Sequence, residues 1–153
     1  MTNFYKPYYD EYFRLIFPEN IELQFEEFKK IALNIKNNDG KLMFAGNGAS
    51  ASISAHGAVD FTKQGGVRAV TFNEANIITC FSNDFGYDNW MSEAVKFYGK
   101  KEDALVLISV SGESPSVISA AKTARKQGIP VITFSGREQN NSLKTIGDLN
   151  FWV

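Results

Sequence analysis

Residues 104–116 read ALVLISVSGESPS, an apolar strand followed by a Ser/Gly-rich turn. Pro115 then opens a predicted helix, because proline is favoured in the first helical turn. Residues 41–50, KLMFAGNGAS, have the same design, with glycines between a predicted strand and a predicted helix. A helix N-terminus presents unpaired N–H groups and a partial positive charge, so each turn is a natural anion site. Serine hydroxyls suit phosphate oxygens, and the scarcity of Lys and Arg in the second turn favours one phosphate on a small molecule over a polyanion.

The rest of the chain after Lys41 alternates between strand-like and helical segments. Short, wholly apolar strands that alternate with helices indicate a mostly parallel sheet covered on both faces. We therefore expect an α/β fold, a three-layer αβα sandwich with a five-stranded, mostly parallel sheet of the flavodoxin-like or Rossmann-like kind. Ligands bind such sheets beyond the carboxyl ends of the strands, where both Ser/Gly turns lie. The predicted strands are 41–45, 67–72, 104–109, 130–135 and 149–153, and the predicted helices between them are 49–63, 74–82, 89–98 and 115–127.

The first 37 residues are predicted to be helical. Aromatic residues recur on one helical face between residues 3 and 16, and Pro18 separates this segment from a second amphipathic helix at about 19–37. We divide the chain into N-terminal helices at 1–37 and a sheet domain at 38–153. The chain stops in a predicted buried strand, so we expect a covering C-terminal helix beyond Val153, or a partner that supplies the cover.

Composition narrows the class of protein. A chain of 153 residues suffices for one domain with a real core, and its net charge of −1 gives no electrostatic case for binding nucleic acid or an anionic membrane. No run approaches the roughly 20 apolar residues of a membrane helix. The single cysteine, Cys80, lies in the apolar run IITCF and is predicted to be a buried, inert thiol. We expect a cytoplasmic protein.

Two motifs have a functional and a structural interpretation. Residues 46–51, GNGASA, loosely fit a dinucleotide-binding turn, but the acidic residue expected some 20 positions on is absent, so we expect no nucleotide. A glycine turn that merely links strand to helix is the alternative. His56 and Asp60 are four residues apart on one helical face, where they form either a metal-binding or acid–base pair or an ordinary surface pair. Two ligands alone are too few for zinc.

Two polar segments after predicted secondary structure are also open to interpretation. Residues 83–87, NDFGY, form either a capped turn or a polar loop over the site in which Asp84 binds sugar hydroxyls. Arg137 follows the predicted strand at 130–135 and either faces the pocket or is a solvated loop arginine.

Taken in order, these motifs resemble those of sugar isomerase (SIS) domains, above all the phosphoheptose isomerase branch. That branch converts sedoheptulose 7-phosphate to a heptose 7-phosphate for bacterial surface polysaccharide. The resemblance covers about residues 20–153 and rests on residues 46–50, on His56 with Asp60, on residues 82–87 and on residues 109–115.

The resemblance implies a role for each matched residue. Asp60 occupies the position of the general base, a glutamate in that branch, and His56 that of a histidine which binds zinc in some members. These two residues are therefore the expected catalytic pair and the possible zinc ligands. The expected substrate-binding residues are Asn47, Gly48, Ser50, Asn83, Asp84, Ser109, Ser111 and Ser114. Of these, Ser50, Ser109, Ser111 and Ser114 would hold the phosphate.

The chain departs from the family pattern at several positions. Asp60 is one methylene shorter than the usual glutamate, and Gln64 stands where an arginine is expected. A glutamine and a histidine of the family's final helix would lie beyond Val153. The resemblance also implies a homo-oligomer, a tetramer or dimer, for which the aromatic N-terminal helix would form an interface. We expect a phosphosugar isomerase, with a non-catalytic sugar-phosphate binding module or an isomerase of a different phosphosugar as alternatives.

Overall fold

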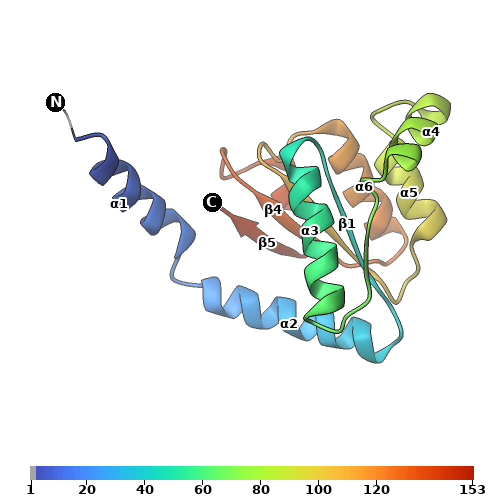
Figure 1. Cartoon of the computed structure of the whole chain (residues 1–153), viewed down its shortest axis with the longest axis horizontal. Coiled ribbons are helices and arrows are strands. Elements are labelled where there is room, and N and C mark those ends of the chain that lie inside the picture. The colour runs from blue at the N-terminus through green and yellow to red at the C-terminus, as the bar shows by residue number, and fades with distance from the viewer. Residues whose placement is uncertain (1–2) are drawn as a thin grey trace.

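The computed structural model describes residues 3–153 and contains the expected five-stranded sheet (Figure 1). All neighbouring strands are parallel, in the order β2-β1-β3-β4-β5. The predicted αβα class is therefore confirmed. The strands are β1 (Leu42–Gly46), β2 (Ala69–Thr71), β3 (Ala104–Ser109), β4 (Val131–Ser135) and β5 (Leu149–Trp152).

The helices between the strands also lie where the sequence predicts them, and one short helix, α7, was not predicted. The prediction of 74–82 for α4 was three residues short, because the helix continues to Gly86, whose left-handed backbone ends it. The helices are α1 (Tyr5–Ile16), α2 (Ile21–Asn37), α3 (Ala49–Lys63), α4 (Ala75–Phe85), α5 (Trp90–Tyr98), α6 (Pro115–Lys126) and α7 (Ser142–Ile146).

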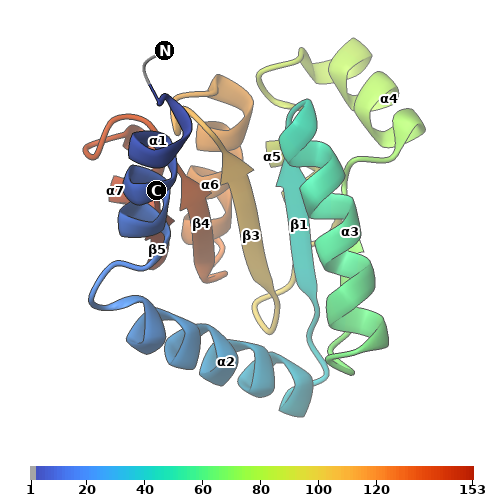
Figure 2. The same cartoon turned by 60° about the vertical axis from the view of Figure 1, so that its left-hand side comes forward.

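Alternate residues of the central strands build two separate cores, one on each face of the sheet. Met43 and Leu105 point to the face that α5, α6 and α7 cover, and Trp90 of α5 is completely buried there. Phe44 and Val106 point to the opposite face, where α2 and α3 pack (Figure 2). Because both faces are covered, β1 and β3 are apolar almost throughout, as expected for a parallel sheet.

The two N-terminal helices differ in their packing. α2 buries Phe28, Ala32 and Ile35 against the sheet. α1 stands away from the sheet and buries none of its residues (Figure 1). Its aromatic side chains from Tyr5 to Phe13 are between 45% and 71% exposed. The second helix thus contributes to the core, whereas the first offers a free aromatic surface; the division at residue 37 stays a prediction.

The prediction that Cys80 is buried was wrong. Ile77, Ile78 and Phe81 of α4 pack against the core, whereas Cys80 is exposed and its Sγ lies 3.8 Å from an Asp84 carboxylate oxygen. The run IITCF therefore combines three residues that pack against the core with two exposed ones, Thr79 and Cys80. An apolar run of five residues does not distinguish an amphipathic helix from a fully buried segment.

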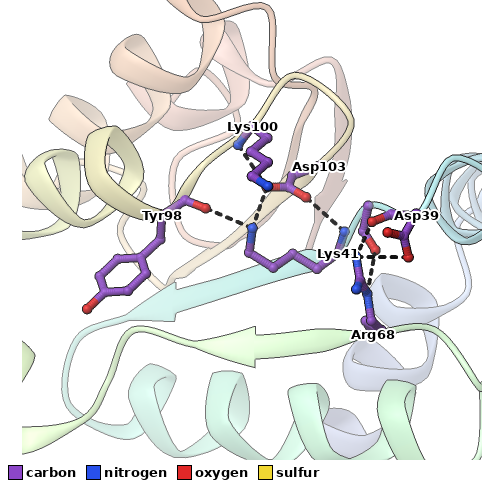
Figure 3. A network of polar contacts seen from close by, with 7 residues as sticks. Asp39, Lys41, Arg68, Tyr98, Lys100 and Asp103 are labelled. Atoms are coloured by element: carbon purple, nitrogen blue, oxygen red, sulfur yellow. Dashed lines mark hydrogen bonds and ion pairs between the residues drawn. The ribbon is translucent and has the colours of Figure 1, made fainter.

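A buried carboxylate joins the amino ends of β1 and β3 (Figure 3). Asp103 is 2% exposed and accepts hydrogen bonds from the Lys41 backbone N–H at 2.9 Å, from Lys41 Nζ at 2.6 Å and from the Lys100 backbone N–H at 2.8 Å. Lys41 Nζ also donates to the Tyr98 carbonyl at 2.7 Å. These bonds fix the start of the two central strands relative to each other, at the end of the sheet opposite the Ser/Gly turns.

The strand order locates the place where a ligand is expected. From β1 the chain moves to β2 on one side and then crosses to β3 on the other side of β1. Crevices for ligands in open parallel sheets form at such a reversal, beyond the carboxyl ends of the strands. The Ser/Gly turns follow β1 and β3 and therefore meet at this reversal.

Candidate functional site

A cavity of about 250 Å³ opens between the two Ser/Gly turns. The turn after β1 contributes Asn47, Ala49 and Ser50 to its lining, and the loop after β4 contributes Arg137. The turn after β3 contributes the remaining residues, which are Ser109, Val110, Ser111 and Ser114. The structure thus brings together five of the eight predicted substrate-binding residues from two turns more than 50 positions apart in the sequence.

The first turn gives the cavity a helix N-terminus. Gly48 has a φ of 57° at the N-cap of α3, a left-handed conformation that glycine adopts without steric cost. Asn73 holds the turn from the side, since it accepts from the Gly46 N–H at 3.1 Å and donates to the Gly46 carbonyl at 2.7 Å. Within the turn the Ser50 and Ala51 N–H groups already donate to the Asn47 and Gly48 carbonyls, at 3.1 and 3.0 Å. The turn therefore brings Ala49 and Ser50, at the N-terminus of α3, to the cavity at the carboxyl edge of the sheet.

The second turn is a cluster of hydroxyl groups held by backbone donors. Ser109 Oγ accepts from the Gly112 N–H at 3.2 Å, and Ser111 Oγ accepts from the Glu113 N–H at 3.2 Å. Ser114 precedes Pro115 at the start of α6, and its side chain makes no capping bond to the helix. Ser109 Oγ also donates to Ser114 Oγ over a long distance of 3.5 Å. Because a hydroxyl that accepts a bond can still donate its own hydrogen, Ser111 and Ser114 can donate to an anion in the cavity, and Ser109 can do so by turning its hydrogen from Ser114.

The unpredicted helix α7 braces the second turn. The Glu113 carboxylate accepts from the Ser142 N–H at 2.6 Å and from the Ser142 hydroxyl at 2.7 Å. These two hydrogen bonds, the one from the hydroxyl first, hold the pKa of the Glu113 carboxyl below its ordinary value. Gly112 fits against Asn141 with a φ of 65°, and a Cβ there would lie 2.1 Å from Asn141 Oδ1.

Asn47 is held at the cavity by two residues that the sequence interpretation missed. Its Oδ1 accepts from the Tyr87 hydroxyl at 3.0 Å, and its Nδ2 donates to Ser116 Oγ at 3.0 Å. Tyr87 belongs to the segment 83–87, for which the sequence left open a capped turn or a polar loop over the site, and its hydroxyl reaches a predicted site residue. The polar segment at 83–87 was the signal, but the sequence does not say which of its side chains makes the contact.

Asn83 and Asp84 themselves are not among the residues that line the cavity. Both are exposed at the end of α4, where Asn83 Nδ2 donates to Asp84 Oδ1 at 2.9 Å. Gly48 is in the first turn beside the lining residues. The predicted roles of these three residues in substrate binding remain predictions.

The expected catalytic pair lies further along α3, outside the cavity lining. His56 Nε2 is 3.5 Å from Asp60 Oδ2, and the two side chains are 79% and 46% exposed. Gln64 Nε2 donates to the other Asp60 oxygen at 3.3 Å. The shared helical face predicted from their spacing is therefore present, and their chemical roles remain predictions.

The His56–Asp60 pair does not by itself make a zinc site. Zinc sites in proteins use three or four protein ligands, and this pair supplies two. Within residues 3–153, no group of three or more His, Cys, Asp or Glu side chains is placed to hold a metal ion.

Comparison with known proteins identifies the family. The family model for the SIS domain matches residues 8–136. The chain belongs to the SIS domain family. This agrees with the resemblance in sequence, and the relatives described next support the phosphoheptose isomerase branch.

Similar proteins include several phosphoheptose isomerases. The one from Helicobacter pylori is 28% identical over 86% of this chain and 71% of its own length. The one from Edwardsiella ictaluri is 37% identical over 65% of this chain and 54% of its own length, so the chain spans only about half of some relatives that it matches.

Solved structures show the same likeness. A phosphoheptose isomerase from Neisseria gonorrhoeae has a TM-score of 0.72 and 33% identity, over 80% of this chain and 67% of that one. A second, from Francisella tularensis, has a TM-score of 0.79 and 22% identity over 96% of this chain and 84% of that one, which shows the shared fold. In the part of the chain that the structure describes, no helix is long and apolar enough to cross a membrane.

Proposed function

We propose that this chain is a phosphosugar aldose–ketose isomerase that converts sedoheptulose 7-phosphate to D-glycero-heptose 7-phosphate, a precursor of bacterial surface polysaccharide. The observation that carries the proposal is the serine-lined cavity at the strand reversal of an SIS domain. Phosphoheptose isomerases among its relatives give the reaction.

The cavity suits the phosphate end of the substrate. Ser109, Ser111 and Ser114 offer hydroxyl donors, and the N-termini of α3 and α6 offer N–H groups with a partial positive charge. α3 runs back along the sheet from this edge, so a phosphate monoester held there reaches Asp60 only if its sugar chain extends along α3.

The position of Asp60 suits a long substrate. Asp60 is ten residues beyond Ser50 on the same helix, a rise of about 15 Å. That rise is comparable with an extended seven-carbon phosphosugar together with the reach of two side chains. A triose phosphate held by the serines would be too short to bring its carbonyl near Asp60.

Isomerisation needs one base that serves two neighbouring carbons. The Asp60 carboxylate takes the proton from the hydroxyl-bearing carbon next to the carbonyl, and the electron pair of that C–H bond forms the carbon–carbon double bond of an enediol as the carbonyl oxygen gains a proton. The same carboxylate then returns the proton to the former carbonyl carbon, while the other hydroxyl loses its proton and becomes the new carbonyl. His56 Nε2 is 3.5 Å from Asp60 Oδ2, which supports a role for His56 in orienting the carboxylate or in moving the oxygen-bound proton.

A non-catalytic sugar-phosphate binding module is the second candidate. The observation in its favour is that His56 and Asp60 lie outside the cavity lining and that Gln64 occupies one Asp60 oxygen. Such a module would be stabilised by sugar phosphates in a melting experiment but would not interconvert them.

We also propose an oligomeric state, a condition for zinc binding and a location for the reaction. The exposed aromatic face of α1 supports a homo-oligomer, a dimer or tetramer, in which a second copy covers that face. Zinc remains a possible cofactor only if ligands other than His56 and Asp60 complete its site. We place the reaction in the cytoplasm, in keeping with a sequence whose single cysteine cannot form an intrachain disulfide.

A coupled assay of sedoheptulose 7-phosphate isomerisation tests the function. We expect turnover by the wild type, with and without added zinc, and a loss of at least about 100-fold in Asp60→Asn, since general-base catalysis contributes factors of this size. Asp39→Asn is the matched control: it makes the same chemical change at an exposed carboxylate that pairs with Arg68 before β1, outside the cavity lining, at a left-handed position that asparagine also tolerates. Absence of turnover together with binding of the sugar phosphate would favour the non-catalytic module.

A further inference from the structure

Arg137 stands at the rim of the serine-lined cavity. It follows Ser135 and Gly136 at the end of β4 and lines the cavity with Ser109, Ser111 and Ser114. Among the described residues that line this cavity, Arg137 is the only one with a charged side chain. Of the two interpretations that the sequence left open for this arginine, the structure supports the one in which it faces the pocket.

The guanidinium of Arg137 is available to a ligand. The other arginines of the chain form ion pairs, Arg14 with Glu11, Arg68 with Asp39 and Arg125 with Asp148. Arg137 takes part in none of the ion pairs found within residues 3–153 and its side chain is exposed. The Glu113 carboxylate of the serine turn accepts two hydrogen bonds from Ser142.

The backbone around Arg137 is fixed in an unfavourable conformation. Arg137 has a φ of 57°, a left-handed value that costs free energy for a residue with a long side chain. The loop is anchored on both sides: the Gly136 N–H donates to the Val110 carbonyl at 3.0 Å, and Asn141 Nδ2 donates to Ser135 Oγ at 3.0 Å. The first of these bonds ties the Arg137 loop directly to the serine turn. A glycine would adopt this conformation without cost, so the presence of arginine points to a use for its side chain.

We propose that Arg137 is a specificity-determining residue that gives the neutral serine cradle its positive charge and selects phosphorylated over unphosphorylated sugars. The inference rests on the proposed function, because it concerns the phosphate end of the same substrate. Hydroxyl and N–H donors recognise the oxygens of a phosphate but also bind neutral hydroxyl groups. A guanidinium adds a fixed charge with a planar set of donors that can bind two phosphate oxygens at once.

Calorimetric titration of the full chain with inorganic phosphate tests the inference. We expect Arg137→Gln to weaken phosphate binding on the order of 10- to 100-fold, the range for a lost charge-assisted hydrogen bond. Arg137→Lys keeps the charge but loses the planar set of donors, so it is expected to bind phosphate more weakly than the wild type and more tightly than Arg137→Gln. Glu138→Gln changes the neighbouring side chain of the same loop and is expected to bind phosphate at least as well as the wild type.

Arg137→Gly separates charge from backbone structure. Because glycine relieves the left-handed strain, we expect this variant to melt at the same or a higher temperature than the wild type while phosphate binding falls as in Arg137→Gln. Phosphate affinities of Arg137→Gln and Arg137→Gly within twofold of the wild type would overturn the inference but leave the proposed function standing, provided that Ser111→Ala weakens binding. A wild type that binds neither inorganic phosphate nor sedoheptulose 7-phosphate would overturn both.

Discussion

Ser114 offers a way to separate ligand binding from folding at a single hydroxyl. The side chain precedes Pro115 but makes no capping bond to α6, so its removal takes no intramolecular cap from the helix. We expect Ser114→Ala to change the free energy of unfolding by less than about 0.5 kcal/mol and to weaken phosphate binding about tenfold. Denaturant unfolding and calorimetric titration measure the two effects. Ser52→Ala, an exposed serine on α3, is the control and is expected to change neither.

Gly112 tests how tightly the second turn is packed. Both Gly112 and Gly128 have a left-handed backbone, with φ values of 65° and 72°, but a Cβ meets Asn141 at Gly112 and open space at Gly128. We expect Gly128→Ala to cost about 1–2 kcal/mol for the backbone alone. Gly112→Ala is expected to cost roughly 3 kcal/mol or more, because overpacking adds to the backbone term. Equal losses in denaturant unfolding would show that Asn141 does not restrain the turn.

Single residues of the site differ in how far the sequence predicts them. The strand–turn–helix pattern singled out the Ser/Gly turn at the sheet edge, and the resemblance to SIS domains singled out Ser109, Ser111 and Ser114 within it. The bond between Tyr87 and Asn47 joins residues 40 positions apart, and only the packing of the α4–α5 loop on the sheet creates it. Cys80 was misplaced because an apolar run does not reveal which side of a helix faces the core.

At the scale of elements, the Glu113 carboxylate joins the second turn to α7 through its hydrogen bonds with Ser142. Glu113 has a lowered pKa in the folded protein, so its contribution to stability is fully present above its ordinary pKa, near 4.3, and is lost as the pH falls through the lowered value. We therefore expect Glu113→Gln to be less stable than the wild type at about pH 6, with a difference that shrinks toward about pH 3. Urea unfolding at a series of pH values measures this difference.

Ser142→Ala is the partner variant for this prediction, since it removes the hydroxyl donor but keeps the backbone N–H. It is expected to reduce the same pH-dependent part of the stability. A Glu113→Gln difference that stays constant over the pH range would contradict the assigned role of the carboxylate.

Elements with a strong pattern were predictable, and short ones were not. The central strands β1 and β3 are apolar almost throughout, and α3 and α6 begin at Ser/Gly turns, so the sequence predicted the bounds of these elements closely. α7 has five residues, little more than one turn, which is too short to show helical periodicity. Its only signal was Asn141, whose side chain caps the Lys144 N–H at 3.0 Å, a residue type that is favoured at the start of helices.

At the scale of the whole molecule, the exposed aromatic face of α1 predicts that the chain forms a homo-oligomer. Its aromatic side chains are exposed and the helix buries no residue, an arrangement typical of a surface that a partner covers. We expect light scattering to give the mass of a dimer or tetramer for the wild type. The double variant Tyr8→Ser, Tyr12→Ser is expected to shift the mass toward the monomer with unchanged far-ultraviolet circular dichroism. A monomeric wild type at micromolar concentration would contradict this part of the proposal.

The alternation of strands and helices in the sequence predicts the fold. It does not predict how one substrate would join the serine-lined cavity to the His56–Asp60 pair. Periodicity places Asp60 on the helix that begins at the cavity, but it does not determine whether one substrate spans the distance from Ser50 to Asp60. That depends on the conformation of the bound sugar and on what covers the exposed side of α3.

Exchange of a carbon-bound proton with solvent tests the central claim most directly. We would incubate sedoheptulose 7-phosphate with the protein in D₂O and follow the protons on the carbons next to the carbonyl by nuclear magnetic resonance. An isomerase that works through an enediol is expected to replace such a proton with deuterium and to form the aldose, and Asp60→Asn is expected to do neither. A wild type that binds the sugar phosphate but leaves those protons in place would contradict the isomerase assignment.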